Sequence, residues 1–323
     1  MPASIRLAIQ ANPWTRQLKT SWATKVKLRR AYTPHETLVG PARARLELWR
    51  IFAGGMIIVA TAMLLSSLAS FLMWFVLQPT GDALDDAMMG QTPLSLLVLL
   101  GGFIFLTLGT GVAVRLLHAR GLASVLGPRQ AVIRDFRRVF LALVTLGIVV
   151  ALLPPYGMGA PLTANLPPLT WLMLLPVSLL ALLIQTSAEE IVFRGYLQQQ
   201  LAARFCSPVI WVGVPSALFA FGHYVPVEAG DNALLVAIWA GVFGALMADL
   251  TARAGNLGPA IGVHFANNLS AIVLVSLPDS LSGLSLYTID IDISDPDTLH
   301  SWMPIDFAMM ILMWLAARLA IRR

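Results

Sequence analysis

Residues 171–194 read WLMLLPVSLLALLIQTSAEEIVFR, a long apolar run that ends in two glutamates and an arginine. The hydrocarbon core of a bilayer is about 30 Å thick, and a helix of about 20 mostly apolar residues spans it. We therefore expect this stretch to form a membrane-spanning helix. Its polar end, which carries Glu189, Glu190 and Arg194, is the first place to look for chemistry.

The rest of the chain has the same character. Of its 323 residues, 57% are hydrophobic and only 12% are charged, whereas soluble domains carry about 25% charged residues. This composition excludes a soluble enzyme, a nucleic-acid-binding protein and a disordered chain. Seven further apolar runs predict an all-α, polytopic membrane bundle with about eight transmembrane helices; they cover residues 51–78, 93–117, 139–158, 209–225, 233–251, 257–277 and 305–321.

The distribution of charge gives the expected orientation. The 22 lysines and arginines lie in the amino-terminal arm, in alternate connections or at the span ends beside them, and ten lie within residues 1–50. The opposite connections carry only acidic charges, within residues 82–86, 228–231 and 279–297. The positive-inside rule then puts both termini in the cytoplasm. We expect a multi-pass protein of a bacterial inner membrane whose partners are the lipid bilayer and not nucleic acid; the oligomeric state is not predicted.

Four regions follow from this pattern. Residues 1–50 form a basic cytoplasmic arm, which we expect to touch anionic lipid headgroups. Residues 51–138 hold two leading transmembrane helices and a basic loop, and residues 139–277 hold the polar motifs. Residues 278–323 comprise an acidic outer loop and the last transmembrane helix. Within that loop, residues 286–293 alternate apolar and polar side chains, which predicts a short hairpin or cap.

Polar side chains inside apolar helices are costly and need partners or a water-filled cavity. Glu190 and Arg194 are four residues apart, so they share a helical face and can pair. Glu189 is rotated by roughly 100° from Glu190, so it points elsewhere. The alternative is that both glutamates simply mark the water interface.

Two later apolar runs carry further candidates. Phe219 and His223 share one helical face, as do His264 and Asn268, with Asn267 beside them. The alternatives are a packed or interfacial histidine in the first run and helix–helix hydrogen bonding in the second.

Other polar or small residues have structural interpretations. Asp249 and Arg253 are four residues apart and predict an ion pair at a helix end. Gly241 and Gly244, and also the pair at positions 101 and 102, predict sites of close helix packing.

Taken together, Glu189-Glu190-xxx-Arg194, Phe219-xxx-His223 and His264-xxx-Asn268 resemble the EExxxR, FxxxH and HxxxN motifs of the CAAX protease and bacteriocin-processing family. That family includes the type II CAAX prenyl endopeptidases. The resemblance covers residues 139–277 and implies an intramembrane endopeptidase without a covalent enzyme intermediate. Its substrate would be a membrane-associated peptide or protein, and no cofactor is expected.

The resemblance also implies a role for each motif residue. Glu189 would be the general base that activates water, and His223 would help to hold that water. His264 and Asn268 would form the oxyanion hole. The supporting residues would be Glu190, Arg194, Phe219 and Asn267.

Three alternatives remain. His223, His264 and Glu189 could instead form a His₂Glu site for a divalent metal such as zinc. The chain could also be a non-catalytic membrane scaffold of the same fold, or a transporter.

The depth of the motifs raises one difficulty. His223 lies 14 residues into its span, or roughly 21 Å along the helix axis, whereas Glu189 is near the opposite end of its own. The two can meet only if the fourth span tilts or extends, if the fifth begins inside the cytoplasm, or if the fifth is re-entrant.

Overall fold

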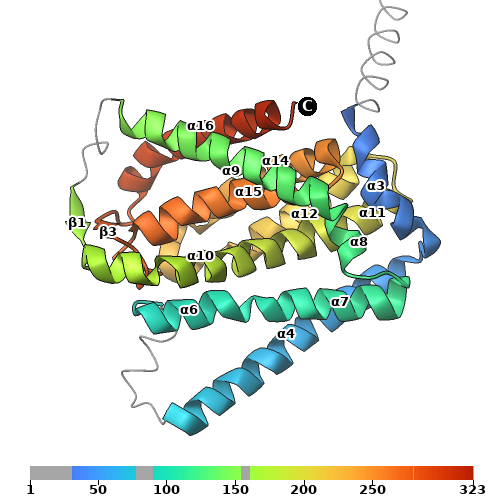
Figure 1. Cartoon of the computed structure of the whole chain (residues 1–323), viewed down its shortest axis with the longest axis horizontal. Helices are drawn as coiled ribbons and strands as arrows, with labels where there is room; N and C mark the ends of the chain where they lie inside the picture. Colours follow the sequence, from blue (N-terminus) through green and yellow to red (C-terminus); the bar gives the residue numbers. More distant parts are fainter. Residues whose placement is uncertain (1–30, 78–89, 154–160, 279, 323) are drawn as a thin grey trace, which may run out of the picture.

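The computed structural model describes residues 31–77, 90–153, 161–278 and 280–322. Nearly all of its regular structure is helical (Figure 1). By length and composition, five helices in the described parts can cross a membrane, and they run Leu48–Phe75, Pro93–His118, Pro168–Arg204, Pro226–Ala254 and Pro296–Ala320. The predicted all-α membrane architecture is thus confirmed in its main feature.

Most of these long helices are composite. The first is α4 (Leu48–Leu77) and the last is α16 (Pro296–Ala320). The others join α6 (Pro93–Gly102) to α7 (Ile104–His118), α10 (Pro168–Glu190) through η4 (Ile191–Leu197) to α11 (Gln198–Arg204), and α13 (Pro226–Ala229) through η5 (Gly230–Asn232) to α14 (Ala233–Ala254).

The other three predicted spans are helical but are too short or too polar to count as membrane-crossing helices by the same criterion of length and composition. They are α9 (Arg129–Ala151), α12 (Pro208–Gly222), and α15 (Gly258–Asn268) continued by η6 (Leu269–Leu274). The first half of α9 is strongly basic, and the 15 residues of α12 measure only about 22 Å. The predicted count of about eight transmembrane helices is therefore not confirmed, and the cytoplasmic position of both termini stays a prediction.

Helix α15 is the centre of the bundle. Its first eight residues, 258–265, are all buried, and it packs against α9, α10 and α14 (Figure 1). Close approach to α9 needs small residues, since a Cβ at Gly262 would lie 3.2 Å from the carbonyl oxygen of Phe136. Helix α12 packs on α14, and α16 covers α9 and α14. This arrangement brings α10, α12 and α15, the three carriers of the sequence motifs, into one bundle.

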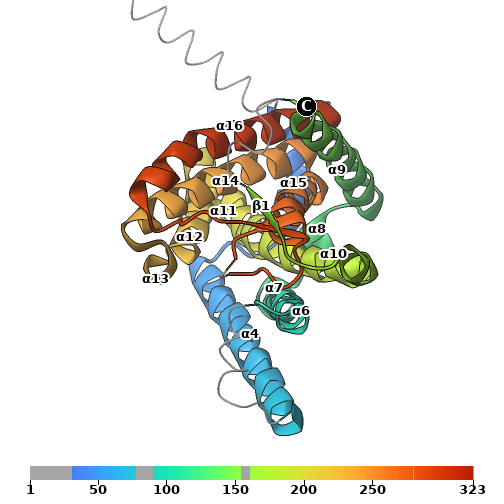
Figure 2. The ribbon, with the colours of Figure 1, turned by 90° about the vertical axis from the view of Figure 1, so that its left-hand side faces the viewer.

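Helix α4 is different because it packs mainly on α7 and diverges from the rest of the bundle (Figure 2). Its start is held by Tyr196, whose hydroxyl lies 3.0 Å from the carbonyl oxygen of Arg50 and 3.1 Å from His118 Nε2. Large apolar side chains such as Phe52 and Trp74 are exposed along it. An apolar helix of this kind suits direct contact with lipid.

Three short strands form a small sheet in the order β1-β3-β2. They are β1 (Leu162–Ala164), β2 (Val275–Ser276) and β3 (Tyr287–Ile289). Strand β3 pairs antiparallel with β1 and parallel with β2. The prediction of a hairpin within residues 286–293 is therefore wrong, because both partners of β3 lie outside that stretch. The alternative, a cap on the outer face, stays a prediction.

Residues 31–44 form an amino-terminal cap made of η1 (Thr33–His35), α3 (Glu36–Val39) and η2 (Gly40–Ala44). Leu38, Val39 and Ala42 are buried. This part of the predicted basic arm thus packs against protein, whereas residues 1–30 lie outside the described residues, as do the acidic side chains of 82–86.

The cap is also held by polar contacts. The Tyr32 hydroxyl donates to Asp249 Oδ1 at 2.7 Å, and Arg120 Nη2 donates to the carbonyl oxygen of Leu38 at 3.4 Å. Burial, reinforced by the bond to Asp249, raises the pKa of Tyr32 to about 12. His35 packs on the ring of Trp211, with 5.0 Å between ring centroids.

Asp249, which accepts the hydrogen bond from Tyr32, also contacts two other side chains. It pairs with Arg253 at 2.8 Å, as predicted, and also accepts a hydrogen bond from Trp314 Nε1 at 3.0 Å. Tyr32, α14 and α16 are thereby joined at one carboxylate.

Candidate active site

The helix that carries Glu189 and Glu190 changes from α-helical to π-helical winding directly after Glu190. Helix α10 ends at Glu190, and the next seven residues, Ile191–Leu197, are π-helical. Helix α15 does the same, because π-helical η6 begins directly after Asn268. Such wide turns are rare and occur frequently at functional sites. Two of the three helices that supply predicted catalytic groups, α10 and α15, therefore depart from regular α-helix beside those groups.

Glu190 and Arg194 form the predicted ion pair. Arg194 Nη1 lies 3.0 Å from Glu190 Oε1, and the two side chains are 1% and 0% exposed. A buried charge is tolerated only when it is paired and hydrogen-bonded. Arg194 meets this requirement by donating through Nη2 to the carbonyl oxygen of Gly244 at 3.2 Å and by lying 4.8 Å above the ring of Phe219.

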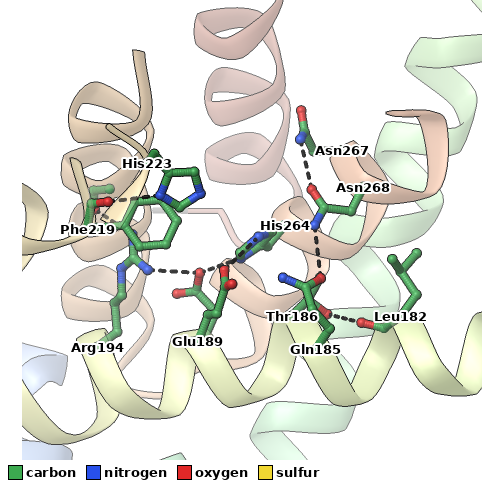
Figure 3. Close-up of polar contacts among 12 residues, drawn as sticks. Leu182, Gln185, Thr186, Glu189, Arg194, Phe219, His223, His264, Asn267 and Asn268 are labelled. Carbon is green, nitrogen blue, oxygen red and sulfur yellow. Dashed lines mark hydrogen bonds and ion pairs between the residues drawn. The ribbon is translucent and has the colours of Figure 1, made fainter. Parts of the chain in front are cut away.

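His264 contacts both glutamates, and Figure 3 shows its ring beside Glu189. Its Nδ1 is 2.8 Å from Glu190 Oε1, and its Nε2 is 3.4 Å from Glu189 Oε2. An ionised carboxylate can only accept, so Nδ1 carries a proton that it donates to Glu190. His264 thus links the ion pair on one side to Glu189 on the other.

Glu189 is the uncommitted carboxylate of the site. Its side chain is 12% exposed, and its Oε2 accepts no hydrogen bond from any residue that the structure describes. The sequence predicts this difference between adjacent glutamates, since only Glu190 faces Arg194. Glu190 Oε2 also lacks a hydrogen bond from the described residues, but the other oxygen of Glu190 is paired with Arg194. Glu189 is therefore the carboxylate better suited to take a proton from a bound molecule.

Phe219 and His223 lie on the opposite side of His264 from Asn268 (Figure 3). His223 Nδ1 donates to the carbonyl oxygen of Phe219 at 2.8 Å, and the two rings are 4.3 Å apart. With Nδ1 protonated, Nε2 of the neutral ring is an acceptor. Within the described residues, no direct polar contact joins His223 to Glu189.

The depth difficulty is resolved by the extended fourth helix. From Glu190 to Arg204 the helix continues for 14 residues (204 − 190), and from Pro208 to Gly222 helix α12 returns by 14 residues (222 − 208). A short connection joins the two, and α11 packs against α12. His223 therefore returns to the depth of the glutamates, because both lie about 21 Å from the connection.

Three side-chain amides form a chain on the other side of the site. Asn267 Nδ2 donates to Asn268 Oδ1 at 3.1 Å, and Asn268 Nδ2 donates to Gln185 Oε1 at 2.9 Å (Figure 3). Gln185 lies one helical turn before Glu189 and is 6% exposed. The amide of Asn268 is thus held at both of its ends.

Gln185, Phe243 and the backbone of Gly244 are site components that the sequence motifs did not predict. Phe243 packs its ring on His264, with 5.2 Å between centroids. A Cβ at Gly244 would lie 3.2 Å from Ser216 Cα and 3.3 Å from Arg194 Nη2. Gln185 could have been found from its position four residues before Glu189 in an apolar helix, whereas an acceptor carbonyl leaves no signal in the sequence.

The predicted close-packing glycines divide into two groups. Gly241 and Gly244 do sit at tight contacts between α12 and α14. The prediction for Gly101 and Gly102 is wrong, because a Cβ at either position would meet nothing within 4 Å.

The alternative metal set has no support from the geometry. Among the described residues, no group of three or more His, Cys, Asp or Glu side chains is placed to hold one metal ion. His223, His264 and Glu189 are therefore not gathered as ligands in this conformation.

Comparison with known proteins agrees with this site. The family model for Rce1-like proteins, described as type II CAAX prenyl endopeptidases, matches residues 169–270, which hold every residue of the three motifs. An uncharacterized protein of Bacillus subtilis (strain 168), YyaK, is 26% identical over 272 residues, which are 78% of this chain and 87% of YyaK. No solved structure matches the chain.

The match and the motifs fall on the same helices. The family description implies a peptidase, and the apolar helices imply that it is embedded in a membrane. Over residues 169–270, the chain is similar to the Rce1-like type II CAAX prenyl endopeptidases, which supports the predicted resemblance to the CAAX protease and bacteriocin-processing family.

Proposed function

We propose that the protein is an intramembrane endopeptidase that hydrolyses a peptide bond with a water molecule activated by Glu189. The observation that carries the proposal is the difference between the two adjacent glutamates. Each glutamate keeps one buried oxygen, Oε2, without a hydrogen bond from the described residues. The carboxylate of Glu190 is bound through Oε1 to Arg194 and His264, whereas that of Glu189 has only the 3.4 Å contact between Oε2 and His264 Nε2.

The first step is the attack of water on the scissile carbonyl. Water is a poor nucleophile, and a positioned carboxylate that accepts its proton accelerates the attack, typically by 10² to 10⁴-fold. Glu189 takes that proton as the new C–O bond forms. His223 Nε2, which is an acceptor because Nδ1 donates to Phe219, orients the other hydrogen of the water.

The second requirement is stabilisation of the oxyanion that develops on the carbonyl oxygen. Preorganised donors are worth about 10² to 10³ in rate for each donor. Asn268 offers the Nδ2 hydrogen that Gln185 does not use. The second donor in this scheme is His264, through an N–H on Nε2 in the doubly protonated form of its ring; Nε2 lies 3.4 Å from Glu189 Oε2.

The reaction then ends without a covalent enzyme intermediate. The proton held by Glu189 passes to the nitrogen of the leaving amine as the C–N bond breaks. Glu189 returns to its ionised state, and the products are a carboxylic acid and an amine. Transfer of the remaining water proton from the acid to the amine leaves a carboxylate and an ammonium group. Glu190 and Arg194 transfer no proton in this scheme. They hold His264 in place.

The substrate class follows from the location of the site. We propose a membrane-associated peptide or protein in a bacterial inner membrane, because the site residues lie on helices of a membrane bundle. Prenylated CAAX peptides are one member of this class, since the matching family is named for them.

The proposal is tested by comparing protein termini in membranes that contain the wild-type chain with those that contain Glu189→Gln. New amino and carboxyl termini should appear with the wild type only. Glu228→Gln, a change at an exposed glutamate outside the three motifs, is the matched control and should behave as the wild type. Identical termini in the Glu189→Gln and wild-type membranes would overturn the proposal.

A further inference from the structure

The amide chain that contains Asn268 has a component with no assigned role. Gln185 is the first residue of the polar end of α10, and it is 6% exposed. Burying an amide is costly unless it is hydrogen-bonded. Its oxygen is used by Asn268 Nδ2 at 2.9 Å.

The contacts of Asn268 fix the orientation of its amide. A primary amide has one acceptor oxygen and two donor hydrogens. The oxygen of Asn268 is occupied by Asn267 Nδ2 at 3.1 Å, and one hydrogen is occupied by Gln185 Oε1. A rotation that exchanged the oxygen and the nitrogen would face Gln185 Oε1 with an oxygen and Asn267 Nδ2 with a nitrogen, so both hydrogen bonds would be lost.

One polar function of Asn268 remains after these two bonds, the second hydrogen on Nδ2. Donation of one hydrogen is what stabilisation of an oxyanion requires, whereas a rotated amide would present its oxygen to a developing negative charge. We infer that Gln185 is a positioning residue, which acts through Asn268 by holding its amide nitrogen toward the scissile carbonyl. This inference rests on the proposed function.

The neighbouring Thr186 provides a matched control. It is fully buried on the same turn of α10, and its hydroxyl donates only to the carbonyl oxygen of Leu182 in its own helix, at 2.9 Å. Thr186→Val removes one buried polar group of similar size without touching the amide chain. Gln185→Met removes the acceptor oxygen while keeping the length of the side chain, and Gln185→Glu keeps an acceptor.

The experiment measures kcat and KM of the purified full-length protein in lipid nanodiscs. The probe is an internally quenched peptide that carries a cleavage sequence found by the terminal comparison above. Gln185→Met should lower kcat by about 10 to 100-fold, less than the loss of a whole donor, with KM nearly unchanged. Gln185→Glu should recover most of that loss, and Thr186→Val should match the wild type.

Combining Gln185→Met with Asn268→Ala distinguishes action through Asn268 from a separate role. Residues that act as one unit are non-additive, so the double variant should be no slower than Asn268→Ala alone. Multiplicative losses, or an unchanged kcat for Gln185→Met, would overturn the inference. A wild-type protein without turnover on any such peptide would instead overturn the proposed function, so the two failures are distinguishable.

Discussion

At the scale of single residues, the site depends on a charge pair that water does not reach. Glu190 and Arg194 are 0% and 1% exposed, so each is stabilised only by the other and by its hydrogen bonds. Removing one member of such a pair leaves an uncompensated buried charge, which typically costs 3–5 kcal/mol. The geometry of His264 is linked to the same pair through Nδ1.

Arg194→Met should therefore destabilise the protein by about 3–5 kcal/mol, which lowers its midpoint of thermal unfolding in detergent. Adding Glu190→Gln removes the orphaned charge, so the double variant should regain part of this loss. A double variant that is less stable than Arg194→Met would contradict the account of the pair as mutual compensation.

Residue-scale prediction from the sequence worked where helical spacing alone determines the contact. The spacing of Glu190 and Arg194 was enough to predict their pairing, and the offset of Glu189 was enough to predict its independence. The contact between Gln185 and Asn268 joins residues 83 positions apart, and spacing within one helix carries no information about it. The same holds for the acceptor carbonyl of Gly244.

At the scale of elements, the amino-terminal cap is the feature with a pH dependence that can be measured. His35 is packed on Trp211 in the cap. Burial, opposed in part by the charge of Glu36, lowers the pKa of His35 to about 4 from 6.5. A lowered histidine pKa means that protonation favours the undocked cap.

The free energy that favours the docked cap should therefore be largest above pH 6.5 and should decrease as the pH falls from 6.5 toward 4. At pH 5 this free energy should be smaller by about 2 kcal/mol, from 1.36 kcal/mol for each pH unit below 6.5. Limited proteolysis at the exposed Arg43 should be faster at pH 5 than at pH 7.5 in the wild type. In His35→Phe this difference should largely disappear. Equal acid sensitivity in both proteins would contradict the assignment of the pH dependence to His35.

The type of each secondary-structure element was predicted better than its boundaries. Every predicted apolar run contains a helix, because a helix satisfies its own backbone groups in a membrane. The run 257–277 nevertheless ends in strand β2. Residues 31–44 and the three-strand sheet were missed, since both depend on contacts between distant segments. The fourth helix was predicted too short because its polar continuation, Gln198–Arg204, lies beyond the apolar run.

At the scale of the whole molecule, the orientation in the membrane is the main untested expectation. The chain has a single cysteine, Cys206, which is exposed in the connection between α11 and α12. The positive-inside rule places this connection in the cytoplasm. The connection that holds Val227, which is 98% exposed, should face the opposite side.

A membrane-impermeant maleimide should therefore label the wild type in inverted vesicles and not in intact spheroplasts. In the variant Cys206→Ser with Val227→Cys, the labelling should be reversed. Labelling of Cys206 from the outside would contradict the predicted topology and would require a new assignment of the connections.

The central claim is that Glu189 activates water in a site assembled from three helices. The most direct test is the turnover of the purified Glu189→Gln protein on a peptide that the wild type cleaves, measured beside its unfolding temperature. We predict a loss of kcat of about 10² to 10⁴-fold, the usual contribution of a general base, with an unfolding temperature close to that of the wild type. Turnover of Glu189→Gln at the wild-type rate would contradict the account.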